Sequence, residues 1–208
     1  MNNVPETSLS RLEKQLALLI EIDKLKAVLR RTRIKSDNAR LENSAEHSWQ
    51  VALMALLLEE HANEPVDIAK VVKMLLIHDV VEIDAGDTFV YDLEATKSQE
   101  ENEKKAAARL FGMLPKEQGD ELLALWHEFE AAQSPEAQFG KALDRLMPML
   151  LNVNTNGQSW KEHGISLQQA LTVNSKIEKG SKTLWDYTQT MLKDAADKGW
   201  LTQPPRER

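Results

Sequence analysis

Apolar residues recur at intervals of three and four along most of the chain, which is the spacing that predicts α-helices. This spacing predicts a first helix from Ser8 to about Arg31 and a long second helix from Ala45 to about His61. The second stretch is apolar around more than one face, as is typical of a central helix. Because no stretch alternates between apolar and polar residues in the manner of a strand, the pattern predicts an all-α fold.

Capping residues and helix breakers divide the rest of the chain. Ser44 is a candidate N-cap for the second helix, Asp67 for a third, and Ser134, followed by Pro135, for a later one. Further helices are predicted over residues 97–111, around 122–129, over 167–178 and over 183–198, with loops at 34–43 and 152–164. We therefore expect a single domain over residues 1–208, with a core at about 8–155 and C-terminal helices at about 166–198 packed on it.

Composition narrows the chemistry that the chain can carry. It has no cysteine, so any metal must be held by His, Asp or Glu, and a reducing cytoplasm is compatible with this composition. The net charge of −7 argues against a nucleic-acid-binding surface, although one small phosphorylated molecule can still bind in a locally basic pocket. No apolar run approaches the roughly 20 residues of a membrane helix, and the N-terminus shows no secretory pattern. We therefore expect a cytoplasmic protein with no membrane or nucleic-acid partner.

Charged residues follow an apolar run directly at LLIHDVVEIDAGD, residues 75–87. His78 and Asp79 come at the end of a predicted buried helix, and Glu82 and Asp87 follow them. Burying a charge without a partner costs several kcal/mol, so a bound divalent cation is the simplest explanation. Adjacent helical residues point about 100° apart, so His78 and Asp79 can share one ion only near the helix end.

Two further candidate ligands lie in other predicted helices. His47 falls in the first turn of the second helix, where the helix dipole disfavours imidazolium and leaves a neutral ring available to a metal; the alternative is a capping or core histidine. Asp144 lies among core residues in KALDRL; the alternative is a buried ion pair with Lys141 or Arg145. Two imidazoles and two carboxylates suit Co, Mn, Fe, Ni or Zn better than Ca.

The order His…His-Asp…Asp on successive helices resembles the HD-domain superfamily of metal-dependent phosphohydrolases. Three segments, ENSAEHSWQVALMA, LLIHDVVEIDAGD and KALDRL, resemble the 5′-deoxynucleotidase branch, and the resemblance covers about residues 25–151. It implies that Glu82 is the catalytic carboxylate and that Asp87 is an acidic residue beside the substrate. The metal ligands that it implies are His47, His78, Asp79 and Asp144.

The basic cluster RRTRIK, residues 30–35, has two interpretations. It is either the solvated end of the first helix, where positive charge complements the dipole, or a source of one arginine for a phosphate. In the deoxynucleotidases an arginine before the first histidine holds the phosphate, and the resemblance implies Arg31, with Arg30 and Arg33 as alternatives. That branch has a tryptophan after its arginine where this chain has Thr32, so base recognition does not carry over.

The resemblance implies hydrolysis of a phosphomonoester, with a (deoxy)nucleoside 5′-monophosphate as the small-molecule substrate. Two alternatives stay open: hydrolysis of an alarmone, nucleoside triphosphate or cyclic nucleotide, and a non-catalytic nucleotide-sensing protein that retains the metal. The presence of Glu82 and Asp87 counts against the non-catalytic alternative. Homodimers are common in the family, and exposed apolar residues on the last two helices are the candidate contact. We expect Trp49, Trp126 and Trp185 to be core anchors.

Overall fold

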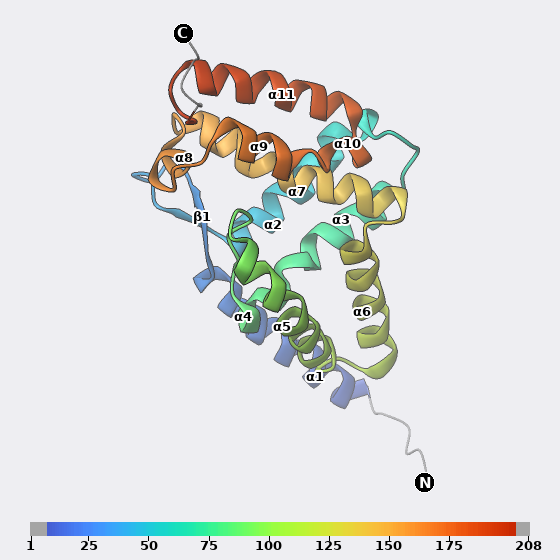
Figure 1. Cartoon of the computed structure of the whole chain (residues 1–208). Helices are drawn as coiled ribbons and strands as arrows, with labels where there is room; N and C mark the ends of the chain where they lie inside the picture. Colours follow the sequence, from blue (N-terminus) through green and yellow to red (C-terminus); the bar gives the residue numbers. More distant parts are fainter. Residues whose placement is uncertain (1–7, 203–208) are drawn as a thin grey trace.

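Helices dominate the computed structural model, which describes residues 8–202 and, for residues 8, 9 and 93–98, the backbone alone (Figure 1). The first seven residues, within the N-terminus that lacks a secretory pattern, lie outside the described residues. The prediction of an all-α fold is confirmed, with one small two-stranded sheet added. Among residues 8–202, no helix combines the length and the apolar character needed to cross a membrane.

The first helix ends well before the basic cluster, contrary to prediction. Helix α1 covers Ser8–Ile22 and the 3₁₀ turn η1 covers Asp23–Ala27, after which strand β1 (Leu29–Arg33) pairs antiparallel with strand β2 (Leu41–Asn43). The arginines therefore lie on a strand and not at a solvated helix end. The hairpin escaped the sequence pattern because its residues are mostly polar, so they give no alternation of apolar and polar positions.

Helix α2 (Ser44–Leu58) is capped by Asn43, one residue before the predicted cap, and the 3₁₀ turn η2 (Glu59–His61) follows it. The Asn43 side chain accepts the N–H of Glu46, and the Glu46 carboxylate accepts the N–H of Asn43, which together form a capping box. Ser44 lies inside the helix, and its hydroxyl donates to Glu82 over 2.5 Å. The cap thereby fixes the first turn of α2.

Helix α3 (Ile68–Ile77) begins at the predicted cap, because the Asp67 carboxylate accepts the N–H groups of Ala69 and Lys70. It runs into the 3₁₀ turn η3 (His78–Val81) and the short helix α4 (Glu82–Ala85). Gly86 then ends α4 with φ at 75°, in the left-handed region that favours glycine. The polar stretch of residues 75–87 is thus a set of tight turns at the end of a buried helix.

In the middle of the chain, two helices agree with the prediction, whereas one begins earlier and another lies where a loop was predicted. Helix α5 (Leu93–Phe111) begins earlier than the predicted Lys97, and helix α6 (Lys116–Ala131) follows it. Helix α7 (Pro135–Asn154) begins as predicted, with the Ser134 hydroxyl accepting the N–H of Ala137 and Pro135 in the first turn. Helix α8 (Gln158–Glu162) replaces part of a predicted loop and carries the buried Trp160.

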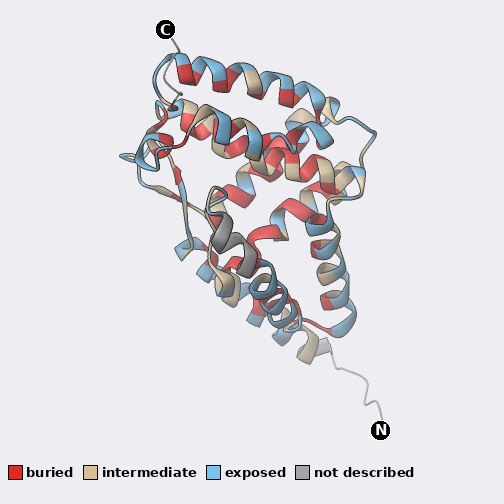
Figure 2. Cartoon of the chain, in the orientation of Figure 1, coloured by how far each residue is buried: buried red, intermediate tan, exposed pale blue. Residues whose placement is uncertain are grey.

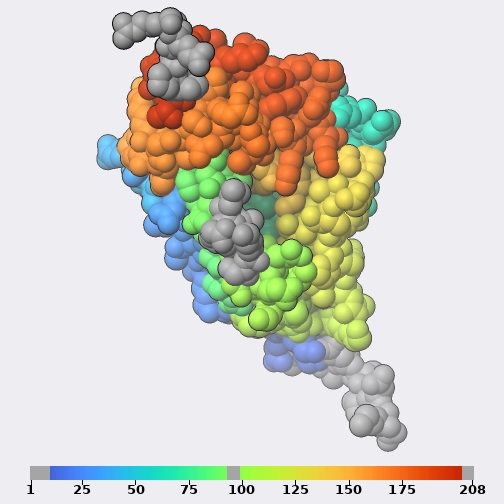
Figure 3. All heavy atoms as spheres, viewed as in Figure 1, coloured from blue at the N-terminus to red at the C-terminus, as the bar shows by residue number. Residues whose placement is uncertain are grey.

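Two hydrophobic clusters meet at the turn η3. The larger cluster joins α2, α3 and α7 to helices α9 (Leu167–Asn174), α10 (Ile177–Gly180) and α11 (Lys182–Asp197). These last helices cover one end of the molecule in Figure 3, and buried positions run along α3 and α7 in Figure 2. The smaller cluster joins α1, α5 and α6. Leu75 belongs to the larger cluster and Val80 to the smaller one, so the chain passes between them at His78.

Exposed apolar side chains lie on other helices than we expected. Trp126 and Trp185 are buried as predicted, whereas Trp49 is 63% exposed, so the core-anchor prediction for Trp49 is wrong. Among the described residues, the last two helices expose a single large apolar side chain, Tyr187, because their other apolar residues face the larger cluster. Helices α1 and α2 expose many more: Leu12, Leu16, Leu19, Ile20, Leu53, Leu56 and Leu57.

Candidate metal centre

Three parts of the chain bring the four predicted metal ligands together. His47 comes from the first turn of α2, His78 and Asp79 from η3, and Asp144 from α7. His47 Nε2 lies 2.9 Å from Asp144 Oδ1, and His78 Nε2 lies 3.5 Å from the same oxygen. His78 Nε2 also lies 3.0 Å from Asp79 Oδ1. His47, His78 and Asp144 each offer one ligand atom within 4.8 Å of the others, a group that could hold a metal ion.

The donor atoms fit a divalent cation. Ligand atoms about 2.0–2.2 Å from one ion lie roughly 3 to 3.6 Å from one another, and the distances above match this range. His78 Nδ1 lies 2.8 Å from the Leu75 carbonyl oxygen, so its N–H donates there and Nε2 is the ring nitrogen left to face the centre. His78 Nε2 is buried and makes no hydrogen bond within the described part of the chain. A metal that replaces the proton on this nitrogen would find carboxylate oxygens beside it.

The alternative interpretation of Asp144 as a partner of neighbouring basic residues does not hold. Lys141 Nζ lies 2.8 Å from Glu130, and the Arg145 guanidinium donates to the Val173 carbonyl oxygen. Asp144 instead points at the two imidazole rings, each of which comes from another helical segment.

Arg30 is the arginine that reaches this centre. Its Nη1 donates to Asp79 Oδ2 over 2.8 Å, whereas Arg31 is exposed and Arg33 pairs with Glu162. Successive strand residues face opposite sides, so the guanidinium of Arg30 is buried while that of the next residue, Arg31, is exposed to solvent. Five carboxylates lie within 4.0 Å of the Arg30 guanidinium: Glu42, Asp79, Glu82, Asp87 and Asp144. These carboxyl groups also offer several oxygen atoms as ligands to a cation.

Burial and repulsion raise the pKa values of two carboxyl groups, whereas neighbouring cationic side chains lower those of two others. Burial, reinforced by Asp79, raises the pKa of Glu82 to about 9 against the pull of Arg30 and Ser44. Burial and Asp79 likewise raise the pKa of Asp87. For Asp79 burial is outweighed by His78 and Arg30, which lower its pKa to about 2. For Asp144 burial is outweighed by both histidines, which hold its pKa well below the ordinary value. The centre therefore contains both protonated and ionised carboxyl groups near neutral pH.

Both histidines have raised pKa values in the metal-free centre. Burial opposes the change, but Asp79 and Asp144 raise the pKa of His78 to about 10. Burial and Arg30 oppose it at His47, where Asp144 and Glu42 nevertheless raise the pKa. The helix dipole alone predicts a neutral His47, and the difference arises because carboxylates from other elements lie closer. A metal must therefore displace these protons when it binds.

Two residues at the centre were not found from the sequence. Glu42, at 0% exposure, lies behind His47, with its Oε2 3.6 Å from His47 Nδ1 and 3.5 Å from Arg30 Nε. Ser44 holds Glu82 through its hydroxyl. Both belong to ENSAEHS, and the expected loop and cap there gave no sign of burial. The hairpin that buries them had no strand signal of its own.

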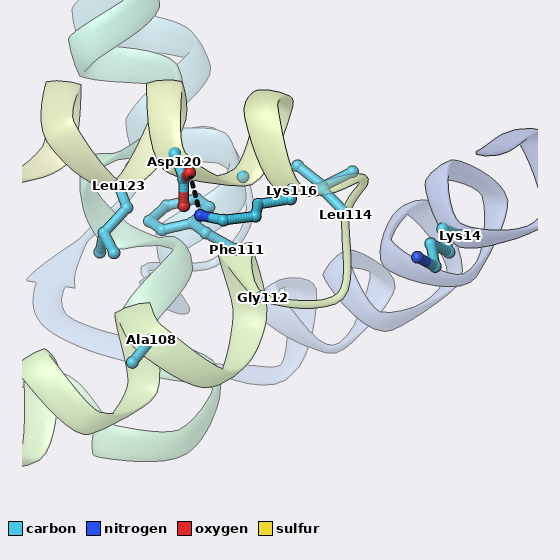
Figure 4. Close-up of a pocket in the computed structure, with 9 residues that line it drawn as sticks. Lys14, Ala108, Phe111, Gly112, Leu114, Lys116, Asp120 and Leu123 are labelled. Atoms are coloured by element: carbon cyan, nitrogen blue, oxygen red, sulfur yellow. Dashed lines mark hydrogen bonds and ion pairs between the residues drawn. The ribbon is translucent and has the colours of Figure 1, made fainter. Parts of the chain in front are cut away.

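Two surface hollows lie elsewhere and contain none of the predicted site residues. One of about 470 Å³ is lined by α1 and Asp23. The other, of about 340 Å³, lies between α1, α5 and α6, and the ion pair of Lys116 and Asp120 crosses its wall (Figure 4). Neither hollow is therefore a candidate for the predicted chemistry.

Comparisons with known proteins agree on one family. The family model for the HD domain matches residues 22–185. The chain is 31% identical over 125 residues to 5′-deoxynucleotidase HDDC2 of Bos taurus, a match to 60% of this chain and 59% of the bovine protein. The human protein of the same name is 28% identical over 124 residues, with the same shares. The chain thus matches less than two thirds of the length of these relatives.

A solved structure is similar over nearly the whole chain. It is described as a predicted metal-dependent phosphohydrolase from Magnetospirillum magnetotacticum and is 49% identical, with a TM-score of 0.86. The similarity covers 93% of this chain and 99% of that one. With a family match over most of its length and the ordered His…His-Asp…Asp set gathered at one point, this chain belongs to the HD domain family.

Proposed function

We propose that the protein is a metal-dependent phosphohydrolase that cleaves a (deoxy)nucleoside 5′-monophosphate to a nucleoside and phosphate. The observation that carries this proposal is the convergence of two imidazoles and Asp144 from separate helices, beside Asp79. The names of the similar proteins support both the reaction and the substrate class. The substrate is a small phosphorylated molecule, which fits one buried arginine better than an extended basic surface.

Four residues hold the metal in this proposal: His47, His78, Asp79 and Asp144. Their mixed nitrogen and oxygen donors suit Co, Mn, Fe, Ni or Zn. Such an ion, when bound, polarises a phosphoryl oxygen and lowers the pKa of a water molecule. The Leu75 carbonyl oxygen fixes the tautomer of His78 that binding requires.

The surrounding residues bind the phosphate and move the proton. Arg30, and not Arg31, offers its guanidinium at the centre, where a planar fork suits phosphoryl oxygens. Glu82 is buried beside the proposed ligands, has a raised pKa in the metal-free centre and is held by Ser44, which suits it to exchange a proton there. Asp87, with Oδ1 3.8 Å from Arg30 Nη1, is placed to accept a hydrogen bond from a sugar hydroxyl.

The direct test uses metal-stripped protein and measures phosphate release. Deoxy- and ribonucleoside monophosphates are offered with Co, Mn, Mg, Ni or Zn in turn. We expect release with at least one transition metal and none after chelation. Release from triphosphates, cyclic nucleotides or alarmones alone would redirect the substrate assignment. Metal and nucleotide binding without turnover with any substrate would identify a sensing protein.

Two substitutions separate metal binding from proton transfer. Asp79→Ala removes a ligand, so metal and activity should be lost together. Glu82→Ala leaves the four ligands in place, so it should keep the metal but lose about 10²–10⁴-fold in turnover. The bound metal is measured by elemental analysis and turnover by phosphate release, with Glu60→Gln on the surface as the control. A nearly normal rate for Glu82→Ala would refute the role of that carboxylate.

A further inference from the structure

Glu42 is a buried carboxylate whose oxygens make no hydrogen bond within the described part of the chain. It lies on β2, directly before the cap of α2. Leaving such a charge unpaired costs several kcal/mol, so a carboxylate at this place requires an explanation. Glu42 is neither a proposed metal ligand nor a proposed proton-transfer residue.

Two donors face the same oxygen of Glu42. His47 Nδ1 lies 3.6 Å and Arg30 Nε 3.5 Å from Oε2, and both nitrogens are themselves buried without a hydrogen bond. An N–H···O hydrogen bond has a length of about 2.7–3.2 Å, so a movement of about half an ångström would satisfy both donors. The Glu42 carboxyl group, His47 Nδ1 and Arg30 Nε, all buried and, among the described residues, without a hydrogen bond, therefore lie together.

The orientation of the His47 ring indicates what Glu42 can do. Its Nε2 faces Asp144, so Nδ1 is the nitrogen that faces away from the metal centre, towards Glu42. When Nδ1–H donates to a carboxylate, the Nε2 lone pair is free for a metal and becomes more basic. His78 uses the neutral Leu75 carbonyl oxygen for the same purpose. The acceptors that face the two histidines therefore differ: a backbone carbonyl oxygen at His78 and a side-chain carboxyl group at His47.

We propose that Glu42 is a positioning residue that orients the metal ligand His47 and the phosphate-binding Arg30 through one carboxylate oxygen. The roles of these two residues rest on the proposed function. Because Arg30 is anchored through Nε, its two terminal nitrogens stay directed at the centre, where Nη1 meets Asp79. Glu42 thereby links the geometry of the metal site to that of the phosphate site.

The test compares Glu42→Gln with Glu60→Gln, an exposed glutamate beyond the other end of α2. Glutamine keeps the size of the side chain and removes its charge, so packing is retained. The affinity for Zn²⁺ is measured by titration calorimetry at one pH, and folding is checked by circular dichroism. We expect the affinity to fall about 10- to 100-fold in Glu42→Gln and to stay unchanged in Glu60→Gln.

A second measurement addresses Arg30. At saturating metal, Glu42→Gln should raise KM for a nucleoside monophosphate by more than it lowers kcat, because the phosphate-binding arginine loses its anchor. In the background of Arg30→Lys, which lacks Nε, the effect of Glu42→Gln on KM should shrink. Equal effects in both backgrounds would remove Arg30 from the proposal.

Two outcomes would overturn the inference. One is a folded Glu42→Gln protein that binds Zn²⁺ within about twofold of the parent affinity, well outside the expected loss. The other is a Zn²⁺-loaded parent protein in which ¹⁵N chemical shifts identify Nδ1 of His47 as the metal-bound nitrogen; this measurement needs no variant to fold. A parent protein that binds no metal would instead contradict the proposed function.

Discussion

Arg30 and Arg31 are neighbours in the sequence and lie in opposite environments. Arg30 has a side chain only 13% exposed and faces the carboxylates of the centre, while Arg31 is exposed. The motif order suggested Arg31, because counting residues through a presumed loop cannot tell which of two adjacent side chains turns inward. The alternation of a strand decides this, and that strand became visible only in the folded chain.

The buried Glu82 should make the stability of the metal-free protein depend on pH. Its pKa is about 9 in the folded chain against an ordinary value of 4.5, so the folded state keeps a proton that the unfolded state releases. This contribution is complete below the ordinary pKa and is lost as the pH rises through the folded one. We therefore expect the Tm in chelator to fall from about pH 5 to about pH 9.

Glu82→Gln tests this expectation because it has no proton to lose. Its Tm should change less over the same range than that of the parent protein. Part of the slope should persist, since the pKa of His78 is raised to about 10 and acts in the same direction. The measurement is thermal unfolding in a series of buffers, and an unchanged slope would contradict the assignment of Glu82.

At the scale of the elements, the strongly periodic helices and two of their caps were predictable. Asp67 and Ser134 begin α3 and α7 as their sequences indicate. Asp144, a proposed ligand on α7, could be singled out from the sequence for the same reason, since a polar residue within an apolar period stands out. The cap of α2 was misplaced by one residue, because Asn43 and Ser44 are both good caps and the choice depends on the hairpin before them.

The parts of the site that could not be predicted all depend on the hairpin. Its two strands bring Arg30 and Glu42 to the centre, and the turn into α2 brings Ser44 to Glu82. A short polar hairpin gains its stability from contacts with the rest of the protein, so its own sequence carries little information. The burial of these residues is a tertiary property that no local pattern encodes.

The approach of α10 to α7 can be tested at Gly180. A Cβ atom there would collide with the Gln138 carbonyl oxygen and would lie 2.8 Å from the Phe139 Cα. Gly180→Ala should therefore lower the free energy of unfolding by about 1–3 kcal/mol, as overpacking does. Urea unfolding measures this loss, with Lys179→Ala, which changes an exposed neighbour, as the control. Equal stability of the two variants would show that the helices separate easily.

At the scale of the whole molecule, the proposed metal ligands come from distant parts of the chain. They come from α2, η3 and α7, and η3 lies between the two hydrophobic clusters. An ion bound by all of them stabilises only the folded state, because the unfolded chain does not hold the ligands at one point. The proposed function therefore predicts that metal binding and folding are linked.

Saturation with metal should accordingly raise the Tm. At a concentration of one hundred times Kd, the ion contributes about 2.7 kcal/mol. For a chain of this size the gain corresponds to roughly 5 to 10 °C. Differential scanning fluorimetry of stripped and Zn²⁺- or Co²⁺-loaded protein measures it, and Asp79→Ala should show almost no change. A similar rise in Asp79→Ala would indicate that the metal binds elsewhere.

The turn that carries His78 and Asp79 is also attached to the smaller cluster, since the Trp126 indole N–H donates to the His78 carbonyl oxygen over 3.2 Å. Sensitivity to amino-acid replacement should therefore extend to residues that lie far from the substrate. Residues of α6 that never meet a substrate should rank among the sensitive positions in a saturation mutagenesis screen for activity. Much of the exposed surface of α1 should accept almost any polar residue.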